Sequence, residues 1–182
     1  MDVLRIAAFS DGETGGNPAG VLIADSLPEA TDMQRIAADV GFSETAFAAP
    51  QADRWRVRYF SPESEVPFCG HATIALGAAL AMRNGDGIYR LALNDADISV
   101  EGRRKGATIA AALQSPPTRS RPAQADLVDE TLALFGYRRA DLADAIAPAW
   151  IHGGADHLAL VLRSREALAA MSYDLKKGQA LM

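Results

Sequence analysis

A thiol and an imidazole lie two residues apart, as Cys69 and His71, in the stretch PFCGHAT over residues 67–73. Gly70 and the Ala-rich run after it predict that a helix begins here. The positive end of the helix dipole and the free N–H groups would favour an anion such as a substrate carboxylate. The same field is expected to lower the pKa of the thiol, which makes Cys69 a candidate thiolate base and His71 a candidate hydrogen-bond donor. The alternative is a small core cysteine beside a structural histidine.

A carboxylate stands among apolar residues in the segment SETAF over residues 43–47. If the segment is a strand, Glu44 shares one face with Phe42, Ala46 and Ala48, while Ser43 lies on the other face. Poor solvation on such a face favours the neutral carboxyl group and raises its pKa toward the range that a general acid/base needs. The alternative is a glutamate on an edge strand that faces water.

A glycine-rich loop precedes the second predicted strand in the sequence GGNPAG over residues 15–20. Its glycines would let the backbone approach a ligand or another strand closely. Because the loop leads into a strand and not a helix, it is no dinucleotide fingerprint, and a tight turn explains it equally well. Its Asn17 is a further candidate for ligand contact. The three histidines, His71, His152 and His157, are far apart in sequence and lack a neighbouring cysteine pair, so no metal site is predicted.

The elements that must position these residues follow from apolar periodicity and turn residues. A capping box at Thr31 and Gln34 predicts the start of a helix, and Gly41 its end. The run over residues 70–84 is dense in alanine and predicts a helix buried on most sides. Strands are predicted over residues 3–9, 19–24, 44–49, 54–60, 88–93, 98–101 and 108–113.

The segment QSPPTRSRPAQA over residues 114–125 lacks apolar periodicity and predicts a linker. It would separate an N-terminal domain, 1–113, from a partial second domain, 126–182. The second part predicts a helix over 126–135, a strand over 157–162 and a helix over 165–171, a thin basis for an independent core. Its apolar faces are expected to lack strands to pack on, and so to cause either local disorder of this segment or its association into a homodimer. These faces carry Leu127, Leu132, Phe135, Leu158, Leu160 and Leu162.

Composition excludes several classes of protein. Of the 182 residues, 49% are hydrophobic, which argues against a disordered chain, and the net charge of −5 gives no electrostatic attraction to nucleic acid. The apolar runs are too short for a membrane span, and the first residues do not have the pattern of a secretory signal. Cys69 is the single cysteine and cannot form an internal disulfide, so a reducing, cytoplasmic location is expected.

Five motifs of the first part resemble, in order and spacing, the phenazine-biosynthesis PhzF-like isomerase family. They are GNPAG (16–20), MQRIA (33–37), SETAF (43–47), RYFSP (58–62) and PFCGHAT (67–73). The resemblance implies an α+β, diaminopimelate-epimerase-like fold, in which two similar halves each wrap a curved sheet around a central helix and the active site lies between them. The first half would be complete and the second partial.

The resemblance also implies an activity, which is cofactor-independent proton transfer on a small carboxylated substrate. By motif match, Glu44 is the catalytic acid/base, Gly70 and His71 line the substrate pocket, and Asn17 and Ser43 border the cleft. Family members carry an Asp-Pro-x-Thr-Gly-Ser motif in the second half, and these 182 residues do not contain it. Asp156, in the cluster GGADH over residues 153–157, is the remaining polar candidate there.

Two other functions stay open at this point. One is a catalytically incomplete binding or dimerisation module. The other is a thiol-dependent racemase that uses Cys69, since related racemases place a cysteine before a glycine-rich helix start. Such a racemase needs a second thiol.

Overall fold

The computed structural model describes residues 2–12 and 14–181, with the side chains of residues 179–181 left out. The chain folds as two compact units, one ending at Pro116 and the other beginning at Pro117. The expected linker over 114–125 is therefore partly ordered, because strand β9 (Arg119–Pro122) lies within it and pairs with β10 (Ala149–His152). Among the described residues, no helix is both long enough and apolar enough to span a bilayer.

The first unit is built on one mixed sheet in the order β1-β2-β3-β4-β6-β7-β8, with β5 paired to β4. Its β2–β3 and β4–β6 pairs are parallel and its other pairs antiparallel. The strands are β1 (Leu4–Ala8), β2 (Asn17–Ile23), β3 (Thr45–Gln51), β4 (Arg54–Phe60), β5 (Glu65–Val66), β6 (Gly87–Ala92), β7 (Asp97–Lys105) and β8 (Thr108–Gln114).

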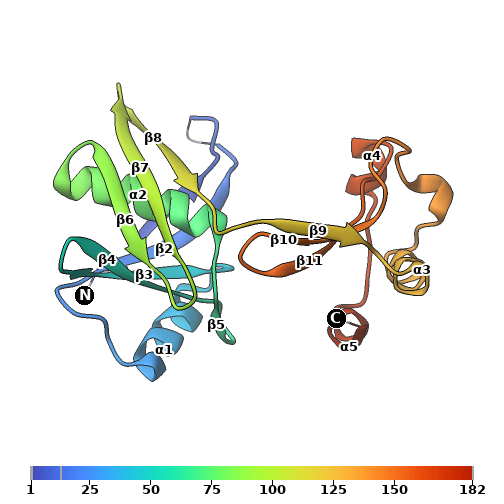
Figure 1. Ribbon diagram of the computed structural model, residues 1–182, viewed down its shortest axis with the longest axis horizontal. Coiled ribbons are helices and arrows are strands. Elements are labelled where there is room, and N and C mark those ends of the chain that lie inside the picture. The colour runs from blue at the N-terminus through green and yellow to red at the C-terminus, as the bar shows by residue number, and fades with distance from the viewer. Residues whose placement is uncertain (1, 13, 182) are drawn as a thin grey trace. The chain divides into compact units, whose positions relative to one another are not determined.

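Helix α2 (Gly70–Asn84) runs through the middle of this unit, and strands from both ends of the sheet order contact it (Figure 1). The predicted burial on most sides is confirmed, since every residue from Ala75 to Ala81 is buried. Small side chains make this possible. A Cβ built on Gly77 would meet Val100 at 2.4 Å, and one built on Gly102 of β7 would meet the Gly77 carbonyl oxygen at 2.4 Å. Two glycines, Gly77 and Gly102, thus allow the central helix to lie directly against strand β7 of the curved sheet.

Helix α1 (Ala30–Val40) covers the other face of β3 and β4 (Figure 1). Its buried Met33 and Ala37 pack with Phe47 in a second, smaller core. Gly41 ends the helix with φ 71°, as predicted. The prediction of a capping box at Thr31 and Gln34 is wrong. The helix begins one residue before Thr31, and its N-cap residue, Glu29, makes no side-chain capping bond.

Strand β3 continues through Pro50 to Gln51, beyond the end predicted at residue 49. The Ala48 carbonyl accepts from Ala24 N on the β2 side at 3.0 Å, and Pro50, two residues further on, faces that same side. The β2–β3 register stops at Ala48, so the missing N–H of Pro50 breaks no ladder bond while the pairing with β4 goes on to Gln51.

The second unit has a three-stranded sheet in the order β11-β10-β9 and a small core. Leu132 and Val128 are buried in that core, and Leu158, Leu160 and Leu162 pack against it. The predicted strand over 157–162 is shorter, and its leucines pack on a helix instead of on further strands. The elements are α3 (Ala125–Leu134), a 3-10 helix (Arg139–Asp141), β11 (Asp156–Ala159), α4 (Arg165–Ala169) and α5 (Leu175–Leu181).

We expect Gly102→Ala to lower the free energy of unfolding of the first unit by about 2 kcal/mol, because the added methyl group would overlap the backbone of α2. Gly87→Ala is the matched control. Gly87 is the register partner of Gly102, and its added Cβ would have only ordinary contacts at 3.9 Å or more. Urea denaturation of both variants checks this, and equal stability of the two would contradict the close packing of α2 on β7.

Candidate active site

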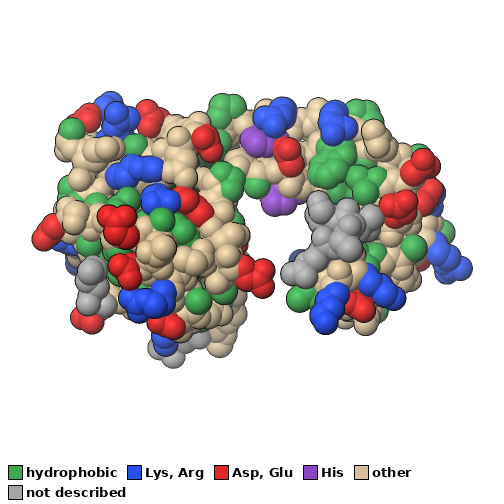
Figure 2. Space-filling model, turned by 90° about the horizontal axis from the view of Figure 1, so that it is seen from below, with side chains coloured by type: hydrophobic (Ala, Val, Ile, Leu, Met, Phe, Trp, Pro, Cys, Tyr) green, Lys and Arg blue, Asp and Glu red, His purple; other side chains and the backbone are tan. Residues whose placement is uncertain are grey.

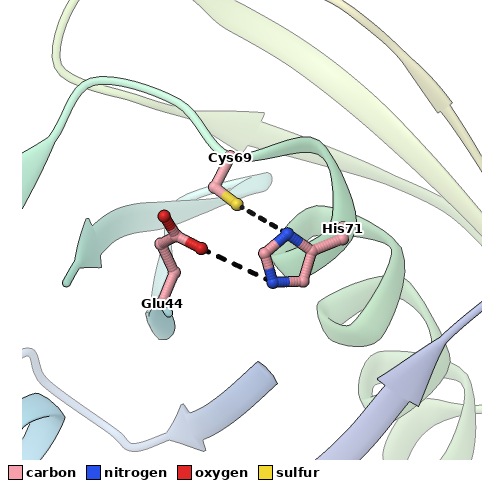
Figure 3. A group of neighbouring side chains, drawn as sticks. All are labelled: Glu44, Cys69 and His71. Atoms are coloured by element: carbon pink, nitrogen blue, oxygen red, sulfur yellow. Dashed lines mark hydrogen bonds and ion pairs between the residues drawn. The ribbon is translucent and has the colours of Figure 1, made fainter. Parts of the chain in front are cut away.

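Glu44, Cys69 and His71 converge at one end of the first unit (Figure 3). Glu44 Oε2 lies 3.5 Å from His71 Nε2, and Cys69 Sγ lies 3.2 Å from His71 Nδ1. Their donor and acceptor atoms all lie within 4.8 Å of one another. The imidazole therefore stands between a thiol and a carboxylate, with one ring nitrogen toward each.

Glu44 is held by the pairing of β2 with β3. Its carbonyl accepts from Gly20 N at 3.1 Å, one residue before β3 begins. Gly20 has to lack a side chain here, since a Cβ would approach Thr45 Oγ1 to 2.6 Å. Ala46 and Ala48 face the α2 core, so the predicted face of Glu44 is the face toward α2.

Cys69 and His71 are held at the start of α2 by a buried hydrogen-bonded chain. The Tyr59 hydroxyl lies 2.7 Å from Thr73 Oγ1, and Thr73 Oγ1 donates to the Cys69 carbonyl at 2.6 Å. Burial raises the pKa of Tyr59, so its phenol stays protonated and available for this bond. The helix start is thus tied to β4 at the residue that carries the thiol.

The loop before Cys69 has its own anchor. Arg58 donates two bonds to Glu65, from Nε to Oε1 at 2.8 Å and from a terminal nitrogen to Oε2 at 2.6 Å. Asn94 donates to Glu65 Oε1 at 2.7 Å. Hydrogen bonding from Arg58 lowers the pKa of Glu65 and keeps it charged. This pair ties β5 to β4 and so fixes where the chain turns toward Cys69.

The thiol of Cys69 is protonated at neutral pH, contrary to expectation. Burial raises its pKa to about 12, and the nearby Glu44 carboxylate acts in the same direction. Hydrogen bonding from the backbone at Ala72 and His71 acts in the opposite direction but is outweighed. The predicted lowering by the helix start is therefore present and is overcome by desolvation.

One tautomer of His71 satisfies all of its neighbours. If Nε2 carries the proton, it donates toward the Glu44 carboxylate, and Nδ1 accepts from the Cys69 thiol. The Ser43 hydroxyl is also 3.4 Å from Nε2. The side chains of His71 and Glu44 are 12% and 22% exposed, so the carboxylate is shielded yet reachable from solvent. Such a group can accept a proton from a bound molecule and return it.

The other predicted site residues lie in different parts of the chain. Gly70 is the first residue of α2. A Cβ built there would meet nothing within 4 Å, so a ligand could approach the backbone at this position. Asn17 is the exposed first residue of β2, on the same face as Ala19 in the α2 core. Asp156 belongs to the second unit, where it pairs with His152 at 2.6 Å and with Arg119 at 3.4 Å. Its cluster forms the turn of the β10–β11 hairpin.

Sequence comparison matches residues 6–182 to the PhzC-PhzF family, "Phenazine biosynthesis-like protein". The chain is 28% identical over 183 residues to "Uncharacterized isomerase PA2770" of Pseudomonas aeruginosa, which covers 100% of this chain and 64% of that protein.

Two solved structures are similar to the fold. A predicted epimerase, PA4716, from Pseudomonas aeruginosa has a TM-score of 0.85 at 22% identity, covering 98% of this chain and 65% of that one. The Bacillus anthracis phenazine biosynthesis protein, PhzF family, has a TM-score of 0.77 at 24% identity, covering 94% and 59%. These likenesses confirm the predicted α+β, epimerase-like fold, and the chain spans less than two thirds of the length of each relative.

We expect iodoacetamide to alkylate Cys69 at pH 8 at least about 100-fold more slowly in the folded chain than in guanidinium, because the reactive thiolate is scarce and buried. As the chain has one cysteine, mass spectrometry gives the rate directly. Equal rates in the two states would contradict the protonated thiol and would restore Cys69 as a candidate base.

Proposed function

Because the chain belongs to the phenazine biosynthesis-like (PhzC-PhzF) family, we propose that it is a cofactor-independent isomerase in which Glu44 moves a proton on a small carboxylated substrate. The family match confirms the resemblance that its five motifs indicate. The observation that supports the proposal is the Glu44 carboxylate, which is 22% exposed and lies 3.5 Å from His71 beside a helix start. The chain spans 64% of the PA2770 relative, which is named an isomerase.

In this proposal each residue has a distinct role. Glu44 takes a proton from a carbon of the substrate and returns it at another position. His71 donates to the carboxylate and holds its orientation, and the Cys69 thiol fixes the ring tautomer by donating to Nδ1. The thiol is a positioning group here, since its proton remains bound at neutral pH.

The substrate carboxylate would lie at the start of α2. Free N–H groups and the helix dipole favour a negative charge there, and the open space at Gly70 lets a ligand approach the backbone. Ser43, whose hydroxyl lies 3.4 Å from His71 Nε2, and Asn17, at the start of β2, are the candidate contacts. Figure 2 shows acidic and basic side chains interspersed over the face that it draws, with no large area of one sign. The start of α2 would supply the local positive field that places the anion.

The thiol-dependent racemase is the weaker alternative. It requires Cys69 as a thiolate and a second thiol, whereas the pKa of Cys69 is raised to about 12 and the chain has one cysteine. We also propose a cytoplasmic setting, because the single cysteine cannot form an internal disulfide.

We expect Glu44→Gln to reduce substrate-dependent proton exchange by at least about 1000-fold, since glutamine has nearly the same shape but cannot accept a proton. Solvent-deuterium exchange, followed by NMR over a panel of small carboxylated compounds, measures this without knowledge of the product. The exchange of a substrate proton with solvent needs only one base, so this measurement tests Glu44 of the first unit by itself.

Asp53→Asn is the matched control, because Asp53 lies in the same unit and its side chain is 72% exposed. This substitution is expected to leave the exchange rate unchanged. Full exchange by the Glu44 variant on a compound that the wild-type chain exchanges would overturn the assigned role of Glu44.

A homodimer through the second unit is the proposed assembly. A hollow of about 430 Å³ in that unit has an almost wholly apolar lining, and large apolar side chains beside it are exposed, as at Leu168 (56%), Tyr173 (48%) and Leu175 (63%). Apolar surface of this kind favours burial against another chain, here a second copy.

We expect light scattering to give the mass of a dimer, and Leu168→Glu with Leu175→Glu to give a monomer. Ile88→Glu is the control, since Ile88 is an exposed apolar residue (69%) of the first unit. A monomeric wild-type chain at high concentration would contradict this assembly, as would a dimer that the double variant leaves intact.

A further inference from the structure

We propose that Glu44, Cys69 and His71 also form a binding site for a thiophilic divalent transition metal, of which Zn²⁺ is the best example. The three residues offer a thiol sulfur, an imidazole nitrogen and a carboxylate oxygen, all within 4.8 Å of one another. In an extension that rests on the proposed function, a metal bound here would occupy the Glu44 acid/base group and block proton transfer.

The spacing of the donor atoms suits one small ion. Zinc binds sulfur at about 2.3 Å and nitrogen or oxygen at about 2.0–2.2 Å in a tetrahedron, which places its donor atoms about 3.3–3.8 Å apart. Cys69 Sγ and His71 Nδ1 are 3.2 Å apart, and the donor atoms of all three residues lie within 4.8 Å of one another. A rotation of the Glu44 side chain toward Nδ1 and Sγ would complete the chelate.

The imidazole can bind the ion through one nitrogen only, and its surroundings favour Nδ1. That atom already lies beside the thiol sulfur. Nε2 would then remain protonated and donate a hydrogen bond to Ser43 Oγ, which is 3.4 Å away. The second nitrogen of the imidazole would therefore also have a partner. Glu44 would turn its carboxylate from Nε2 toward the ion, and the thiol proton would leave to solvent as the sulfur–metal bond forms.

The donor types select the metal. A thiolate with an imidazole and one carboxylate is typical of Zn²⁺ or Co²⁺, whereas Mg²⁺ and Ca²⁺ bind sites made of oxygen atoms. Three protein ligands leave a fourth position for water, and the partial exposure of Glu44 and His71 gives the ion access. Sequence spacing gives no sign of this site, because Glu44 lies 25 residues before Cys69.

Two elements hold the three ligands before any metal arrives. Cys69 and His71 are fixed by the bonds of Tyr59 and Thr73 at the start of α2, and Glu44 by the bond from Gly20. Preorganisation of this kind reduces the entropy lost on binding. The pair of His152 and Asp156 in the second unit, 2.6 Å apart, offers two donors, and Asp156 is 65% exposed, so it serves as a comparison.

The test is a Co²⁺ titration of the metal-free, reduced 182-residue chain, followed by absorption spectroscopy. We expect a near-ultraviolet thiolate-to-cobalt charge-transfer band together with the visible bands of a tetrahedral site, both removed by Zn²⁺. His71→Ala and Glu44→Gln should each weaken Co²⁺ binding at least about tenfold. Cys69→Ser should abolish the charge-transfer band, and His152→Ala should change neither band nor affinity. Circular dichroism checks that each variant is folded.

A wild-type chain without the charge-transfer band would overturn the site. So would unchanged Co²⁺ affinity in both folded variants, His71→Ala and Glu44→Gln, since the metal would then be bound by the cysteine alone. Zn²⁺ should also slow the deuterium exchange with the same apparent affinity, and a chelator should restore it. Exchange that persists with the cobalt site filled would show that metal binding does not block proton transfer and would overturn the role of Glu44, while the metal site itself would stand.

Discussion

The first unit depends on the close contact between α2 and β7. Gly77 and Gly102 lack the side chains that would separate helix from strand, and the backbone of one occupies the space where the Cβ of the other would lie. The helix can therefore be buried along its length by the curved sheet. As its start is tied to β4 through Tyr59 and Thr73, this burial also sets the position of Cys69 and His71. The site depends on helix packing as much as on its own residues.

Two physical effects oppose each other at Cys69. The start of a helix stabilises a negative charge, whereas burial penalises it, and here burial dominates with support from the Glu44 carboxylate. The resulting neutral thiol can donate a hydrogen bond to Nδ1 of the imidazole, whose Nε2 faces the carboxylate. Of the two groups that flank His71, Glu44 is partly exposed and Cys69 is buried. The two proposed activities, proton transfer and metal binding, would use the same lone pairs, since a Brønsted base is also a potential metal ligand.

The two units differ in how they use their apolar residues. The first encloses a helix, and Leu76, Leu80 and Val100 are fully shielded in its core. The second buries a much smaller core around Leu132, while Leu175 and other large apolar side chains stay exposed. In the second unit, Asp156 forms surface ion pairs with His152 and Arg119. Among the described residues, the cluster of Glu44, Cys69 and His71 lies in the first unit, and the apolar hollow with its exposed apolar side chains lies in the second.

The sequence by itself determined the elements whose causes are local. Alternation gave the strand over 54–60, Gly41 gave the end of α1, and alanine density gave the buried helix over 70–84, because a few neighbouring residues decide each of these. Its motifs also identified the family and the candidates Glu44 and His71. Tertiary structure decided the rest. Pro50 remains in β3 because β2 has already ended, the Pro- and Arg-rich segment becomes β9 because β10 pairs with it, and the thiol of Cys69 keeps its proton because distant strands bury it. Each of these outcomes depends on contacts between segments far apart in the chain, which no local pattern of residues encodes.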